Sequence, residues 1–171
     1  MNLSVARKEM EQLNTMTMNL KPGDPVPKPP QPCSEKEIMS GWEGDLEAPL
    51  VSVVCITFNQ EKYISEALDS FLAQKTNFPY EVIVHDDCST DRSRTIIESY
   101  VTHYPRIIKP VFQSENQFSQ GKRPTFVASK YTRGRYIALC EGDDFWVGAD
   151  KLQRQADFLA GNLDFSAVTH Q

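Results

Sequence analysis

The chain has 171 residues, 40% hydrophobic and 10% aromatic, so it holds enough apolar material for a folded core and lacks the composition of a disordered protein. Eighteen Lys and Arg residues against 23 Asp and Glu give a net charge of −5, which argues against general nucleic-acid binding. No apolar run approaches the roughly 20 residues of a membrane span, and the N-terminus lacks a signal-peptide core. We therefore expect a cytoplasmic protein whose widely spaced cysteines are reduced.

The first 48 residues differ in composition from the rest. Six of the 11 prolines lie between Pro22 and Pro32. Proline has no backbone N–H, so this stretch is expected to be an extended, flexible linker. Short helices are predicted over 3–13 and 34–39, and Trp42 is the side chain expected to dock on the folded part. We assign residues 1–48 to an N-terminal appendage and residues 49–171 to one domain.

The remainder alternates apolar runs with amphipathic segments, which is typical of an α/β domain with a mainly parallel sheet flanked by helices. The run LVSVVCIT is almost unbroken, as expected for a strand covered on both faces. The patterns predict strands over 50–57, 80–87, 107–112, 135–144 and 165–170, and helices over 63–72, around 96–101, over 125–132 and over 152–159.

Polar clusters follow three of the predicted strands: Thr57-Phe58-Asn59, Asp86-Asp87, and Glu141-Gly142-Asp143-Asp144. In open parallel sheets, ligands bind beyond the carboxyl ends of the strands. An acidic pair there could instead cap the next helix, as Ser89, Thr90 or Asp91 can do. Two acidic pairs and an aromatic turn on one edge favour a ligand site over caps.

The residue types indicate what such a ligand would be. An ionised Asp87 accepts hydrogen bonds only, so it suits a pyrimidine N–H or a ribose hydroxyl, and Phe58 offers a flat face for a base. Glu141 and Asp143 hold two carboxylates one residue apart. Hard oxygens of this kind suit Mg²⁺ or Mn²⁺, which usually bind through one or two carboxylates and substrate phosphates.

Three segments resemble the opening blocks of the family 2 glycosyltransferases, which have the GT-A fold: PLVSVVCITFNQEKYISEALDSFLAQ, YEVIVHDDCSTDRS and GRYIALCEGDDFW. The resemblance covers residues 49–171 in order. It implies a Rossmann-like GT-A domain in which Thr57, Phe58 and Asn59 contact the nucleobase. It also implies that Asp87, with Asp86 beside it, is the uracil-binding aspartate.

The same resemblance assigns the metal and diphosphate contacts. Glu141 and Asp143 match the two acids of the DxD element, and Asp143 is the expected direct ligand of Mn²⁺ or Mg²⁺. Lys122 and Arg123 lie in a loop on the binding edge and could reach diphosphate oxygens, although a solvated pair of charges fits the sequence equally well. The family's first acid is usually Asp, and Glu141 has one more methylene.

Another departure concerns catalysis. In the family, the general base lies beyond the fifth strand, so it is expected after Gln171 and no catalytic residue is assigned within the chain. The expected activity is inverting transfer of a sugar from a nucleotide-diphosphate sugar, with UDP-sugar as the expected donor, to a glycan or lipid-linked acceptor in polysaccharide biosynthesis. Family membership suggests work at the cytoplasmic face of a membrane, with peripheral association.

Other functions were weighed against this one. A noncatalytic sugar-nucleotide-binding or interaction module, which lacks the acceptor half, remains the alternative. A dinucleotide-dependent oxidoreductase needs a Gly-rich turn after the first strand, and TFNQEK contains no glycine. His85 is expected to face away from Asp86 by strand alternation and to have a structural role.

Overall fold

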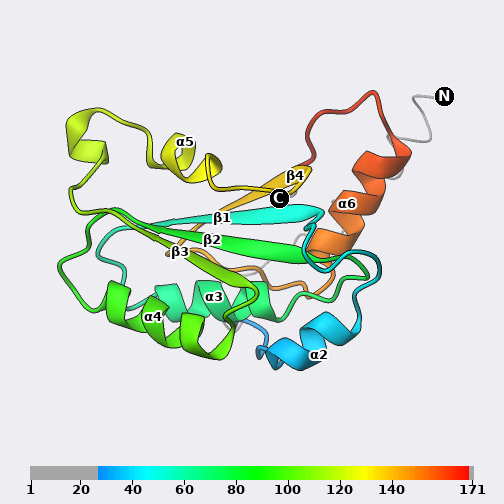
Figure 1. Cartoon of the computed structure of the whole chain (residues 1–171), viewed down its shortest axis with the longest axis horizontal. Coiled ribbons are helices and arrows are strands. Elements are labelled where there is room, and N and C mark those ends of the chain that lie inside the picture. The colour runs from blue at the N-terminus through cyan, green and yellow to red at the C-terminus, as the bar shows by residue number, and fades with distance from the viewer. Residues whose placement is uncertain (1–26, 170–171) are drawn as a thin grey trace, which may run out of the picture.

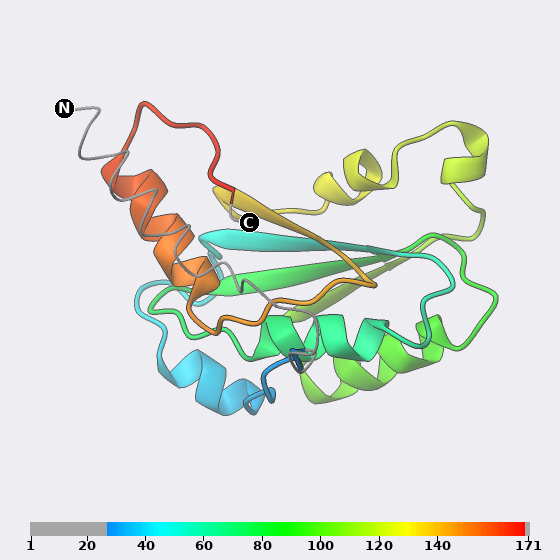
Figure 2. The same cartoon turned by 180° about the vertical axis from the view of Figure 1, so that it is seen from behind.

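A computed structural model describes residues 27–169, so the helix predicted over 3–13 and residues 22–26 of the proline-rich linker lie outside this part, whereas residues 27–32 of the linker form neither helix nor strand. Parallel strands form one four-stranded sheet with helices on both faces (Figures 1 and 2). The elements in chain order are α2 (Glu35–Ser40), β1 (Val51–Thr57), α3 (Ile64–Leu72), β2 (Tyr80–Asp86), α4 (Ser93–His103), β3 (Ile108–Phe112), the 3₁₀ turn η1 (Phe118–Gln120), α5 (Pro124–Ser129), β4 (Tyr136–Glu141) and α6 (Lys151–Gly161).

The strands lie in the order β3-β2-β1-β4, and every neighbouring pair is parallel. β1 therefore lies in the middle, which explains why its sequence is apolar on both faces. All seven residues of β2 are buried as well. The predicted strands and helices of this part are confirmed to within a few residues, except for the last strand.

The two faces of the sheet are covered differently. α3 and α4 lie along one face, whereas α5 and the loop before it rise over the other at the carboxyl ends of the strands (Figure 1, left). The main core lies between the sheet and α3, and its fully buried side chains include Leu68, Phe71 and Val84. A smaller cluster under α5 contains Val54, Ile83, Val111 and Ala128. The carboxyl edge is thus framed on both sides.

The predicted fifth strand is wrong for the part that is described. Residues 165–169 form no strand, and they pair with no strand of the sheet. They line one side of a hollow of about 610 Å³ whose other walls are β4 and α6. Because the segment stands off from β4, the β-branched residues there cannot form the ladder of hydrogen bonds that would make them a strand.

The segment before β1 packs against the domain. Ile38 of α2 is buried, and the ring of Trp42 meets Tyr80 edge-on with 5.4 Å between centroids. The indole N–H donates to Thr76 Oγ1 at 3.1 Å. Docking through Trp42 is confirmed, whereas the domain boundary at residue 49 stays a prediction.

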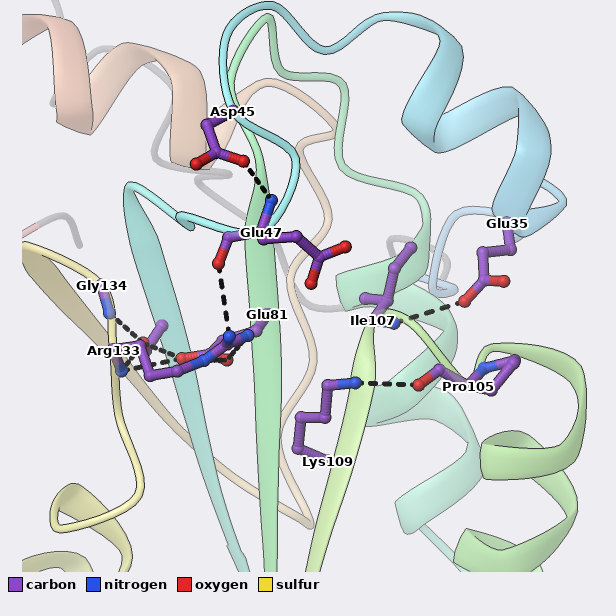
Figure 3. A network of polar contacts seen from close by, with 10 residues as sticks. Glu35, Asp45, Glu47, Glu81, Pro105, Ile107, Lys109, Arg133 and Gly134 are labelled. Carbon is purple, nitrogen blue, oxygen red and sulfur yellow. Dashed lines mark hydrogen bonds and ion pairs between the residues drawn. The ribbon is translucent and has the colours of Figure 1, made fainter.

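A polar network ties this segment to the amino ends of the strands (Figure 3). Arg133 Nε and Nη2 both donate to Glu81 Oε2, at 2.9 and 2.8 Å. Ser52 Oγ and the Arg133 backbone N–H donate to Glu81 Oε1 at 2.7 and 2.8 Å. Glu47 accepts from Arg133 and Arg106. A buried carboxylate is tolerated here because four donors replace its water.

Candidate functional site

The three polar clusters meet at the carboxyl edge, as the parallel topology requires. Asp87 N donates to Thr57 O at 3.0 Å, so the second cluster continues directly from the first. Gly142 N donates to Ile56 O at 2.8 Å, which joins the third cluster to β1 from the other side. The predicted residues after β1, β2 and β4 are therefore neighbours.

Asn59 is occupied by a structural role. Its side-chain oxygen accepts hydrogen bonds from the backbone N–H groups of Thr90 and Asp91 at 2.7 and 3.3 Å, and its own N–H donates to Ser89 Oγ at 2.9 Å. Asn59 has a φ of 55°, a left-handed conformation that asparagine tolerates better than most residues. Phe58 beside it is 46% exposed, so its ring is free to receive a base. Nucleobase contact by this turn stays a prediction.

Asp86 and Asp87 are both 1% exposed, and both carboxylates are engaged. Ser89 donates to Asp86 through its hydroxyl and its N–H. The backbone N–H groups of Gln117 and Phe118 donate to Asp87 Oδ1 and Oδ2 at 2.7 and 3.0 Å. In this structure the loop after β3 therefore covers Asp87, and uracil binding by Asp87 stays a prediction.

Glu141 and Asp143 are exposed, and no hydrogen bond or ion pair engages either carboxylate within residues 27–169. No three His, Cys, Asp or Glu side chains of that range gather to form a complete metal site. Two free carboxylates suit Mg²⁺ or Mn²⁺ when substrate phosphates supply the remaining ligands. The donor set therefore fits the predicted cation, with Glu141 and Asp143 to hold it.

Gly142 between them sits against β1. A Cβ there would lie 2.5 Å from Gln60 Oε1 and 3.0 Å from Thr57 Cβ, so only glycine lets the turn approach this closely. Thr57 Oγ1 and Gln60 Oε1 are themselves buried, and neither has a hydrogen-bond partner in the described part of the chain. A buried oxygen without a hydrogen bond costs folding free energy, and such unsatisfied groups are typical of functional sites. Two of them lie beside the acidic turn. Gln60 is a residue that the motif reasoning missed.

Lys122 and Arg123, the two basic residues predicted to reach the diphosphate, lie at the amino end of α5. Both are exposed, and Lys122 Nζ donates to Gln117 Oε1 at 2.7 Å. Arg123 immediately precedes Pro124, the first residue of α5. Their contact with diphosphate stays a prediction.

Two hollows lie away from these clusters. One of about 340 Å³ lies among residues that include Trp42, Arg106 and Lys109 at the amino ends of the strands. The other is the hollow beside β4 described above. Neither hollow reaches Asp87. The candidate site is therefore the carboxyl edge of the sheet, where Glu141 and Asp143 are exposed and Asp86 and Asp87 are covered.

Several titratable groups near the edge are perturbed by burial. Burial raises the pKa of the Cys140 thiol to about 12, which makes it a poor nucleophile, and burial also raises the pKa of Cys55 well above its usual value. Burial also lowers the pKa of His85, although Asp87 and Asp86 oppose the shift. Cys55 and Cys140 therefore pack as neutral side chains, and no disulfide joins the four cysteines described here.

Comparison with known proteins gives the family. The sequence profile of glycosyl transferase family 2 matches residues 52–170. The chain belongs to this family. An uncharacterized protein of Mycobacterium tuberculosis is 44% identical over 120 residues, which are 70% of this chain and 34% of that protein. The putative teichuronic acid biosynthesis glycosyltransferase TuaG of Bacillus subtilis is 36% identical over 71% of this chain and 44% of its own length.

Solved structures agree on the fold. Residues 1–349 of TarS from Staphylococcus aureus, in complex with UDP-GlcNAc, match with a TM-score of 0.56 and 34% identity over 66% of this chain and 32% of that one. The mannosyltransferase PcManGT of Pyrobaculum calidifontis, in complex with GDP-Man and Mn²⁺, matches with a TM-score of 0.57 over 92% of this chain and 40% of that one, at 22% identity. The domain has the GT-A fold, and the chain spans about a third to under half of these relatives.

Proposed function

We propose that this family 2 glycosyltransferase domain binds a nucleotide-diphosphate sugar, with a UDP-sugar preferred, and that the protein transfers the sugar with inversion. The acceptor would be a glycan or lipid-linked glycan in polysaccharide biosynthesis. The observation that carries the proposal is the convergence of Phe58, the buried aspartates and the free Glu141 and Asp143 on one edge of a parallel sheet. Relatives named for teichuronic acid synthesis and for transfer to poly(ribitol-phosphate) support the acceptor class.

Each group would have a defined part in donor binding. Phe58 would stack on the base, and the two cations at the start of α5, Lys122 and Arg123, would approach the diphosphate. A divalent cation on Glu141 and Asp143, when bound, would neutralise the diphosphate that leaves. Neighbours solved with UDP-GlcNAc and with GDP-Man and Mn²⁺ support a nucleotide-sugar and metal of this kind.

We propose that the protein associates peripherally with the cytoplasmic face of a membrane, where it would encounter lipid-linked acceptors. No helix within residues 27–169 is long and apolar enough to cross a bilayer. Flotation with vesicles that contain an anionic lipid tests the association, and a protein that stays in the soluble fraction at low salt would contradict it.

Calorimetric titration of UDP and UDP-GlcNAc, with and without Mn²⁺, tests donor binding. Asp143→Ala should abolish the Mn²⁺-dependent part of the affinity. Asp164→Ala, an exposed acid outside the clusters, is the matched control and should change nothing. Unchanged metal dependence in Asp143→Ala would remove the metal assignment, and no binding by the wild-type chain would remove the donor assignment.

The second candidate function is a noncatalytic nucleotide-sugar-binding module. Each residue assigned to the candidate site, from Phe58 to Asp143, has a part in donor binding, and binding is all that such a module requires. A donor hydrolysis assay separates the two functions. Release of UDP from UDP-GlcNAc above the rate without protein supports an enzyme, whereas binding without release supports the module.

A further inference from the structure

His85 and Asp87 form a buried pair on the α5 face of the sheet. They are two residues apart at the end of β2, so their side chains project from the same face, and they are 0% and 1% exposed. His85 pairs in register with Ile56 on one side and Val111 on the other. In Figure 1, the chain that leaves β3 rises over this end of the sheet before it enters α5. Ile83, which shares its face with His85, clusters with Val111 and with Ala128 of α5. The loop before α5 bonds Asp87, so the pair lies on the face that this loop and α5 cover.

The loop is held down by Asp87. Besides the two N–H bonds from Gln117 and Phe118, Asn116 Nδ2 donates to the Asp87 carbonyl oxygen at 3.1 Å. Charge-assisted bonds of this kind are stronger than neutral ones. They run between backbone amides of the loop and a carboxylate that any ligand with its own N–H would also seek. We call residues 113–121, held in this way, the latched loop.

The His85 imidazole differs from the Asp87 carboxylate in its hydrogen bonding. Neither ring nitrogen has a hydrogen-bond partner among residues 27–169, although both atoms are buried. Because burial lowers its pKa, the imidazole is neutral near pH 7 and carries one donor and one acceptor. A buried polar group without a partner destabilises the arrangement that covers it. With the latched loop in place, the Asp87 carboxylate therefore accepts hydrogen bonds, whereas the His85 ring makes none to the described residues.

We propose that His85 is a second nucleobase-binding residue, uncovered when a base takes the place of the latched loop on Asp87. A ring N–H of the base would donate to the Asp87 carboxylate, and the adjacent carbonyl oxygen would accept from the His85 ring N–H. The inference rests on the proposed donor binding. It adds that the base must carry a ring N–H next to a carbonyl.

This requirement separates the common bases. Uracil and guanine both present a ring N–H beside a carbonyl oxygen, whereas cytosine and adenine have no ring N–H on the corresponding edge. A site that hydrogen-bonds such an edge rejects bases that leave its polar groups unpaired. The chain should therefore bind UDP and GDP in preference to CDP and ADP, and His85 should carry part of that preference.

The latch is tested by Gln117→Pro. Gln117 has a φ of −72°, which proline adopts without strain, so the substitution removes the amide that bonds Asp87 Oδ1 and leaves the backbone geometry possible. The control Gln117→Ala keeps the amide. If the latch competes with the base, Gln117→Pro should bind UDP about tenfold more tightly than Gln117→Ala, since a larger fraction is competent. Equal or weaker binding would overturn the competition.

His85→Leu tests the second contact. Replacing an unpartnered buried imidazole by an apolar side chain should raise the midpoint of urea unfolding, while UDP affinity should fall by about tenfold and that for CDP should not change. A rise in stability with unchanged UDP affinity would overturn the role of His85. A fall in both stability and the affinities for all nucleotides would also overturn it, as the sign of a merely structural residue.

Failure of the proposed function has a different signature. Exchange of the Gln117 and Phe118 amides with deuterium, in wild type and Asp87→Asn, reports the latch without nucleotide. Faster exchange in Asp87→Asn together with no nucleotide binding by the wild type would show a real latch and a wrong function, which removes the proposal for His85. UDP binding that leaves both amides protected would retain the function and overturn the displacement.

Discussion

The buried carboxylate of Glu81 provides the most direct test of the energetics. Its side chain is 2% exposed, and both bonds to Oε2 come from the guanidinium of Arg133, at 2.9 and 2.8 Å. Arg133→Met keeps the aliphatic stem and removes both donors. Oε2 is then left buried without a partner, while Oε1 keeps Ser52 and the backbone N–H of residue 133.

The expected cost is about 2–4 kcal/mol of the free energy of unfolding. Breaking a buried ion pair costs about 3–5 kcal/mol, and the value is reduced here because the Arg133 side chain is 52% exposed. Arg106→Met is the matched control, since Arg106 contacts Glu47 at the same 2.8 Å but the two side chains are 50% and 75% exposed. The control should lose only about 0–1 kcal/mol.

Equilibrium urea unfolding followed by tryptophan fluorescence measures both variants against wild type. The reasoning requires that Arg133→Met lower the unfolding midpoint clearly more than Arg106→Met, with equal slopes. If the two variants lose the same stability, burial of the acceptor does not decide the strength of these pairs, and the account of the network in Figure 3 is wrong.

Three further predictions concern the backbone at Cys88 and Gly134 and the perturbed Lys151. Cys88 has a φ of 68°, so Cys88→Gly should gain about 1 kcal/mol of unfolding free energy whereas Cys88→Ala should gain nothing, by thermal unfolding. Gly134→Ala places a Cβ 2.5 Å from Ser52 N, so this variant should lose about 2–3 kcal/mol of unfolding free energy. The Cβ of Gly161→Ala meets open space in α6, so that variant should lose none. Equal losses in the two variants would refute the steric explanation. Burial lowers the pKa of Lys151 to about 8, so the folded chain loses this proton before the unfolded one, and stability relative to Lys151→Met should rise from about pH 8 toward 10.5. A flat difference over that range would contradict the shift.

The parallel sheet and the edge proposed for the site followed from the sequence, whereas the order β3-β2-β1-β4 did not. Runs such as 50–57 and 80–86 are apolar over their whole length, and burial on both faces is a local property that composition records. Once the strands are parallel, Thr57, Asp87 and Glu141 must end at one edge. Glu141 and Asp143 could also be proposed as metal-binding acids from the sequence, because their short motif is contiguous.

Only the tertiary structure decided how those residues are used. The sequence identifies Asp87 as a hydrogen-bond acceptor, but it does not show that amides 30 and 31 positions later in the chain bond to its carboxylate. Residues 165–169 have strand composition and no partner on β4. Glu81 is stabilised by Arg133, 52 positions away. Hydrogen-bond partners at such separations depend on how the elements pack against one another. Periodicity in the sequence indicates on which face of an element a residue lies, but it does not indicate which residues contact it there.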